Sequence, residues 1–176
     1  MKTTSKYTVQ QVIDAGHDEE NALKVIALCQ FMDCEPDDLK QESHDHYGLT
    51  LFERGSQSYA IGTDEEADSA CVEYCRDSVW AFNASFILDE CGLPSELEEA
   101  FQSFQSNECE GANDAMLALV EKCCKGGIKE FTQSAISADG RGHFLSGYDG
   151  NEGEEFVTIG EEDKAQGSRF YIYRTN

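Results

Sequence analysis

The sequence predicts an α+β fold in which helices pack on a small antiparallel sheet, with residues 1–176 forming a single domain. Apolar residues recur at helical spacing through much of residues 8–138, whereas residues 48–63 change to the two-residue alternation of strands. After residue 138 the composition shifts to glycine, aromatic residues and acids, which is typical of short strands joined by tight turns. Residues 1–47 could form an N-terminal helical subregion.

The first third of the chain contains helices followed by a hairpin. Residues 8–15 and 19–32 are predicted helices, because their apolar residues fall on one face. Pro36 suits the first turn of a short helix over 36–41, since its φ is already fixed near the helical value. Residues 48–63 are predicted as a β-hairpin, because apolar residues alternate on both sides of a Gly-Ser turn.

The clearest start signal belongs to a helix that follows the hairpin. Thr63 is the predicted N-cap, and Glu66 completes a capping box, in which each side chain accepts from the other residue's backbone N–H. Asp64 and Glu65 lie where the helix dipole favours negative charge. The helix is predicted to run to about residue 82. Its core-facing stripe consists of Ala67, Cys71, Tyr74, Cys75, Val79 and Phe82.

The remaining elements are three helices and three short strands. The helices span 94–105, 113–124 and 127–138, and the strands span 143–148, 155–160 and 169–174. Side-chain alternation in the last strand puts Phe170 and Ile172 on one face and the two tyrosines of this strand on the other. Together with the hairpin, these strands give about five for one antiparallel sheet.

The chain is strongly acidic: 35 Asp and Glu against 13 Lys and Arg give a formal net charge of −22. Direct nucleic-acid binding and docking on anionic membranes are not expected, because both need clustered Lys and Arg. An aromatic content of 10% argues against intrinsic disorder. The sequence has no apolar run long enough to span a membrane and no signal-peptide pattern, so we expect a cytoplasmic protein.

Eight cysteines occur without a CxxC pair. In a cytoplasmic protein such residues are expected to be free and mostly buried thiols, while a disulfide or a metal site stays open as an alternative. We predict neither a cofactor nor a metal site.

Two clusters of acidic residues form the first candidate site. Rows of carboxylates can take the place of phosphates in a basic groove, and long-range attraction speeds the encounter. The predicted partner-binding residues are Asp149, Glu152, Glu154 and Glu155 in a loop without a base, and Asp64, Glu65 and Asp68 on the capped helix. The alternatives are that the acids only keep the protein soluble, or that they reflect a halophilic origin.

A second candidate site is the segment that contains Asp139, Arg141 and His143, with a glycine between each pair. A histidine near a carboxylate can act as a general acid or base, and a tyrosine such as Tyr148 could complete the site. The alternative interpretation is a turn at residues 139–140 and an Arg141 that pairs with one of the many carboxylates.

A third candidate is the short motif His44-Asp45-His46. Two histidines two residues apart face the same way in a strand, but this stretch precedes the hairpin and no third ligand is found by spacing. A surface loop is therefore expected. The sequence contains no P-loop, dinucleotide-binding glycine pattern, nucleophile elbow or HExxH helix.

Several segments resemble a family of small proteins carried by phages and related mobile elements. These are residues 63–68 (TDEEAD), 78–86 (SVWAFNASF), 138–146 (ADGRGHFLS), 148–150 (YDG) and 171–176 (YIYRTN), within roughly the C-terminal two-thirds. The family has no assigned catalytic mechanism, so the resemblance supplies no functional residues. It implies a phage context, in which small acidic anti-CRISPR and antirestriction proteins are a recurrent class.

Charge and resemblance together lead to the hypothesis of a phage-encoded, non-enzymatic inhibitor. In the cytoplasm of the host cell, it would act as a DNA or RNA mimic on the basic surface of a host nuclease or CRISPR effector. One alternative is an enzyme or small-ligand protein that uses Asp139, Arg141 and His143. Another is a phage adaptor that binds through an apolar patch and whose acidity serves only solubility. The sequence does not indicate an oligomeric state.

Overall fold

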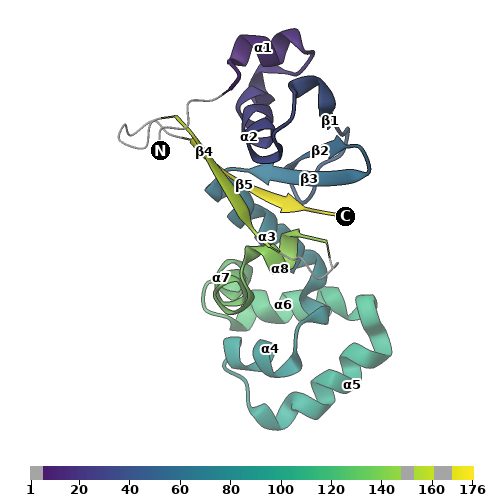
Figure 1. Ribbon diagram of the computed structural model, residues 1–176. Helices are drawn as coiled ribbons and strands as arrows, with labels where there is room; N and C mark the ends of the chain where they lie inside the picture. Colours follow the sequence, from purple (N-terminus) through teal and green to yellow (C-terminus); the bar gives the residue numbers. More distant parts are fainter. Residues whose placement is uncertain (1–5, 148–152, 161–167) are drawn as a thin grey trace. The chain divides into compact units, whose positions relative to one another are not determined.

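The computed structural model describes residues 6–147, 153–160 and 168–176 and has an α+β fold, which confirms the predicted class (Figure 1). In these residues five strands form one antiparallel sheet in the order β1-β2-β3-β5-β4. The strands are β1 Lys40–Gln41, β2 Thr50–Arg54, β3 Gln57–Gly62, β4 Glu155–Ile159 and β5 Ser168–Arg174.

Contacts divide the chain into two compact units. Unit 1 consists of Met1–Ala70 and Arg141–Asn176, and unit 2 consists of Cys71–Gly140. The predicted N-terminal helical subregion therefore belongs to the same unit as the sheet. The prediction of a single domain over residues 1–176 stays a prediction.

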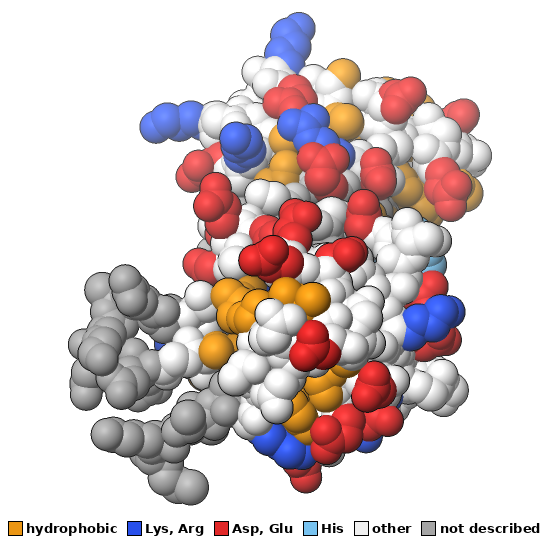
Figure 2. Space-filling view, turned by 90° about the horizontal axis from the view of Figure 1, so that it is seen from above, with side chains coloured by type: hydrophobic (Ala, Val, Ile, Leu, Met, Phe, Trp, Pro, Cys, Tyr) orange, Lys and Arg blue, Asp and Glu red, His pale blue; other side chains and the backbone are white. Residues whose placement is uncertain are grey.

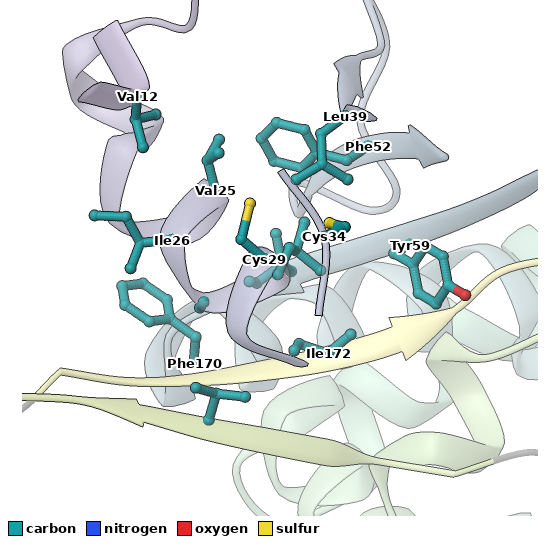
Figure 3. Close-up of a cluster of buried hydrophobic side chains, with 14 of the residues drawn as sticks. Val12, Val25, Ile26, Cys29, Cys34, Leu39, Phe52, Tyr59, Phe170 and Ile172 are labelled. Carbon is teal, nitrogen blue, oxygen red and sulfur yellow. The ribbon is translucent and has the colours of Figure 1, made fainter. Parts of the chain in front are cut away.

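The core of unit 1 lies between two helices and one face of the sheet. Helices α1 (Val9–Asp14) and α2 (Ala22–Met32) supply Val12 and a buried run over residues 25–29. In Figure 3 these side chains gather with Phe52 and Phe170 from the strands. Because five consecutive residues of α2 are buried, the helix is apolar on more than one side.

The last strand follows the predicted alternation. Phe170 and Ile172 are buried in the core of unit 1 (4% and 2% exposed), and Tyr171 and Tyr173 lie on the opposite face of the sheet. The hairpin is confirmed as well, because β2 pairs with β3 in register from Thr50 to Arg54.

Two local predictions are wrong. Residues 143–148 were expected to form a strand, but helix α8 (Arg141–Leu145) lies there. Phe144 and Leu145 are both buried, although neighbours in a strand would point to opposite faces. Gly142 also packs so closely on residue 153 that an added Cβ would lie 2.8 Å from its carbonyl carbon, so the compact helical turn needs glycine here.

The second wrong prediction is the end of the short helix expected over residues 36–41. Pro36 does occupy its first turn, but the helix is a 3₁₀ turn that ends at Asp38. The chain then forms β1, because residues 40 and 41 pair with Glu53 and Phe52 of the neighbouring strand. Pairing with the hairpin therefore determines where this helix ends.

Helix α3 (Asp64–Ser78) begins as predicted. The backbone N–H of Thr63 donates to Glu66 Oε2 (2.7 Å), and the N–H of Glu66 donates to Thr63 Oγ1 (3.3 Å), which completes the capping box. The α-helix ends at Ser78 and a 3₁₀ turn, Val79–Ala81, continues it almost to the predicted end.

Unit 2 contains the remaining helices and its own apolar core. The helices are α4 Ala84–Glu90, α5 Glu98–Glu108, α6 Asn113–Cys123 and α7 Gly127–Asp139. Two 3₁₀ turns, Ser95–Leu97 and Cys109–Ala112, also belong to unit 2, whereas the 3₁₀ turn Glu19–Asn21 precedes α2 in unit 1. The predicted Gly-Gly break is confirmed, since Gly126 and Gly127 have φ of +88° and +64°. Phe131 is fully buried, and its ring meets Phe82 and Phe86 at centroid distances of 5.1 and 5.2 Å.

The cysteines are free thiols, and six of the eight are buried. Burial raises the pKa of Cys75 and of Cys91 to about 11, so both thiols stay protonated near neutral pH. They therefore act as small apolar side chains of the core of unit 2.

Candidate functional site

The site is centred on Arg141, the first residue of α8, whose side chain is only 10% exposed. Its Nη1 atom donates to Asp64 Oδ1 (2.9 Å) and to Asp68 Oδ1 (3.0 Å). Its Nε and Nη2 atoms donate to the two carboxylate oxygens of Glu154, at 2.6 and 3.1 Å. One guanidinium thus holds three carboxylates from two separate segments, and one of these contacts is bidentate.

Two tyrosines of β5 complete the surroundings of Arg141. The guanidinium lies over the ring of Tyr171, 4.2 Å from its centroid, which is a cation–π contact. The hydroxyl of the fully buried Tyr173 donates to Glu154 Oε2 (2.5 Å). Both rings project from the face of β5 opposite the core of unit 1, so the alternation of this strand supplies the floor of the site.

Electrostatics favour the charged forms of Asp64 and Arg141. The hydrogen bond from Arg141 lowers the pKa of Asp64, and burial opposes this effect only in part. Burial lowers the pKa of Arg141, but the hydrogen bonds to Glu154 and Asp64 outweigh it and leave that pKa above its usual value. The arrangement holds three carboxylates in place around one guanidinium.

The structure brings together residues that the sequence placed in two clusters. Asp64 and Asp68 of α3 and Glu154 converge on Arg141, and the neighbouring Glu65 is exposed. Glu155 is exposed too, but it pairs with Ile172 in the sheet and so lies on the face opposite Arg141. The other two predicted partner-binding residues, Asp149 and Glu152, lie outside the described residues, as does Tyr148. Sequence reasoning missed the roles of Tyr171 and Tyr173, although their place on the face of β5 opposite Phe170 and Ile172 was predicted.

The segment proposed as a catalytic site has a different organisation. Asp139 is the exposed last residue of α7, and His143 is an exposed residue of α8 whose ring lies against Phe144. The alternative interpretation, in which Arg141 pairs with carboxylates, is confirmed by its three ion pairs. Its guanidinium is thus already occupied by protein carboxylates.

The His44-Asp45-His46 motif lies in the expected loop before the hairpin. His46 Nε2 lies 2.9 Å from the carbonyl oxygen of Leu145, and since a carbonyl can only accept, Nε2 carries the proton. Asp45 Oδ1 accepts from the N–H of Gly48 (2.9 Å) and closes the turn. Among the described residues, no cluster of three or more His, Cys, Asp or Glu has the geometry of a metal site.

His46 gives unit 1 a pH dependence. Its pKa lies below the usual value, chiefly because burial disfavours the charged ring. A neutral ring is therefore favoured in the folded state, so stability is highest above about pH 6.5 and falls as the pH drops from there toward the lower folded pKa. Between pH 7 and 5, wild type should lose stability relative to His46→Gln, by about 1.4 kcal/mol for each pKa unit of difference. Urea unfolding at several pH values measures this.

The matched control for this prediction is His44→Gln, because His44 is exposed in the same loop. It should follow the wild-type pH profile. Parallel profiles for wild type and His46→Gln would show that protonation of His46 does not affect folding.

A hollow in unit 1 is open and polar, with a volume of about 540 Å³. Lys24 reaches into its wall, where Nζ donates to Thr50 Oγ1 (3.0 Å) and to Glu66 Oε1 (2.9 Å). The lining also includes Glu42 and Asp45. Because its lysine is already paired, this hollow offers no free cation to an anionic ligand.

No protein-family model, curated protein or solved structure matches the chain. The resemblance to phage proteins therefore stays a prediction. In the part of the chain that the structure describes, every helix is too short or too polar to cross a membrane.

Proposed function

We propose that this chain is a phage-encoded acidic inhibitor that occupies a basic nucleic-acid-binding surface of a host defence complex, as an anti-CRISPR or antirestriction protein does. One observation carries the proposal: carboxylates from α3 and the carboxylate of Glu154 gather on one surface of unit 1, where Arg141 holds three of them in place. Acidic side chains are also spread over the face shown in Figure 2, with fewer Lys and Arg among them.

The fixed positions of these carboxylates distinguish this surface from one whose acids only keep the protein soluble. A mimic must hold its charges where phosphates would lie, because mobile side chains lose conformational entropy on binding. Asp64 and Asp68 keep 70% and 46% of their side chains exposed while their positions are held by Arg141. Such carboxylates can accept hydrogen bonds from Lys or Arg of a partner with little further ordering.

The occupied guanidinium favours this function over the enzymatic alternative. A substrate anion would have to displace Asp64, Asp68 or Glu154 to reach Arg141. Glu154 also accepts from the hydroxyl of the buried Tyr173, so displacement of its carboxylate would disturb a second hydrogen bond. The adaptor alternative predicts a complex that does not depend on salt, because screening weakens contacts between charges and not apolar contacts.

The test is capture of partners from a bacterial lysate at about 0.1 and 0.5 M salt, followed by competition with duplex DNA and a cleavage assay. Capture of a basic nucleic-acid enzyme should be lost at the higher salt and displaced by DNA. The reversal Glu65→Lys, on α3 between Asp64 and Asp68, should weaken capture about tenfold, since it replaces attraction by repulsion.

The matched control is Glu19→Lys. Glu19 is also an exposed acid of unit 1, so the net charge changes equally while the proposed surface stays intact. This control should weaken capture only slightly. Equal effects of the two variants, or capture that ignores salt and DNA, would contradict the proposed function.

A further inference from the structure

Helix α5 of unit 2 has an apolar stripe that the core of this unit uses only in part. Leu97, Ala100, Phe101 and Phe104 follow the spacing i, i+3, i+4, i+7 and so lie on one side. Phe101 packs against the core, but no residue of α5 is buried. Leu97 and Phe104 remain 40% and 41% exposed. In Figure 1 α5 lies at the outside of the group formed by α4 to α7.

Polar contacts hold α5 in this orientation. Gln105 Nε2 donates to the carbonyl oxygens of Trp80 and Phe82, both at 2.7 Å. Gln105 lies one position beyond Phe104 on the helix, so rotating α5 to bury Phe104 would move the amide away from both acceptors. The exposed apolar residues are therefore fixed on the surface before any partner binds.

The charge around this stripe has one sign. No Lys, Arg or His occurs between Arg76 and Lys122, and Arg76 is itself paired with Glu73 and Glu121. Glu96 and Glu108, at the two ends of the stripe, are exposed acids, and Glu98 and Glu99 form the first turn of α5. An apolar strip with an acidic border is complementary to an apolar anchor with a basic border.

We propose that the α5 strip, formed by Leu97, Ala100 and Phe104, is a docking surface for a basic partner protein that inserts an apolar side chain between these residues. The inference rests on the proposed function, because it takes the same basic partner and gives it a second contact on unit 2. A second copy of the chain is disfavoured as the occupant, since it would bring two acidic borders together. An anionic membrane is disfavoured for the same reason.

This contact would make the complex dissociate more slowly than carboxylates alone would. Charge attraction speeds association and weakens with salt, whereas burial of Phe104 and Leu97 slows dissociation and resists salt. Aromatic residues that are half-buried before binding serve as anchors at interface centres, with acidic residues forming the rim.

The experiment is an NMR titration of the ¹⁵N-labelled full chain with a synthetic helical peptide. The peptide carries Leu at i, i+3, i+4 and i+7 and Lys on both flanks. We expect the amides of α5 and the indole of Trp80 to shift first, and Phe104→Ser to weaken binding about tenfold. A peptide with Ser in place of Leu should show no preference for α5, and a peptide with Glu in place of Lys should not bind.

The matched control is Phe156→Ser, which removes a 57% exposed phenylalanine from β4 in unit 1. It should leave peptide binding unchanged. Equal effects of Phe104→Ser and Phe156→Ser, or shifts that avoid α5, would overturn the inference. So would concentration-dependent self-association that Phe104→Ser abolishes, since that would assign the strip to a second copy.

The two proposals can fail separately. Peptide binding at α5, together with lysate capture that DNA does not displace, would leave the docking surface standing and contradict mimicry. DNA-sensitive capture without peptide binding at α5 would overturn the docking surface alone.

Discussion

Replacing Arg141 with alanine is expected to destabilise unit 1 by about 3 kcal/mol. The change leaves Asp64, Asp68 and Glu154 close together without their shared cation and removes the contact with the ring of Tyr171. The loss should lie at the lower end of the range for buried ion pairs, because Asp64 is 70% exposed and can be rehydrated. Hydrogen exchange of β5 amides measures this effect, since the only tryptophan, Trp80, reports on unit 2.

The matched control is Arg169→Ala, on the same strand that carries Tyr171. Arg169 is exposed and lies over the ring of Phe156, 4.9 Å from its centroid, so its loss should cost less than about 1 kcal/mol. Arg141→Lys should fall between the two, because it keeps the charge and loses the bidentate contact. Similar stabilities of Arg141→Ala and Arg169→Ala would show that the three-carboxylate cluster does not stabilise the fold.

Acid should reduce the difference between wild type and Arg141→Ala. The pKa of Asp64 is lowered in the folded state, chiefly by its hydrogen bond from Arg141, so its stabilising contribution is present above the unfolded value of about 4. That contribution is lost as the pH falls through the folded pKa.

Local signals explain what the sequence predicted well. The capping box of Thr63 and Glu66 needs only residues three positions apart, and the alternation of Phe170 and Ile172 needs only one strand. Such short-range patterns depend little on the rest of the fold, so they can be predicted from the chain itself.

The parts that could not be predicted depend on distant contacts. Arg141 pairs with Asp64, 77 positions earlier, and neither residue carries a local sign of the other. Helix α8 was mistaken for a strand, because the fit of Gly142 against residue 153 is a tertiary contact. The sequence also does not show that Asp64, Asp68 and Glu154 share one arginine, which neutralises part of their charge.

In unit 2, Phe131→Ala should cost about 3 to 5 kcal/mol of stability. Phe131 is fully buried, and its ring meets Phe82 and Phe86 edge-on, so alanine leaves a cavity that three helical segments would have to collapse to fill. Urea unfolding followed by the fluorescence of Trp80, which packs against the same core, measures the loss directly.

Phe104→Ala is the control for this prediction, and it also connects stability to the docking surface. Its ring is 41% exposed, so truncation should cost less than about 1.5 kcal/mol. A protein optimised only for stability would gain by burying such a ring. If Phe104→Ala instead destabilised unit 2 as much as Phe131→Ala, the ring would belong to the core and α5 would have no apolar surface available for a partner. A small loss of stability together with a large loss of peptide binding would mean that Phe104 serves recognition more than folding.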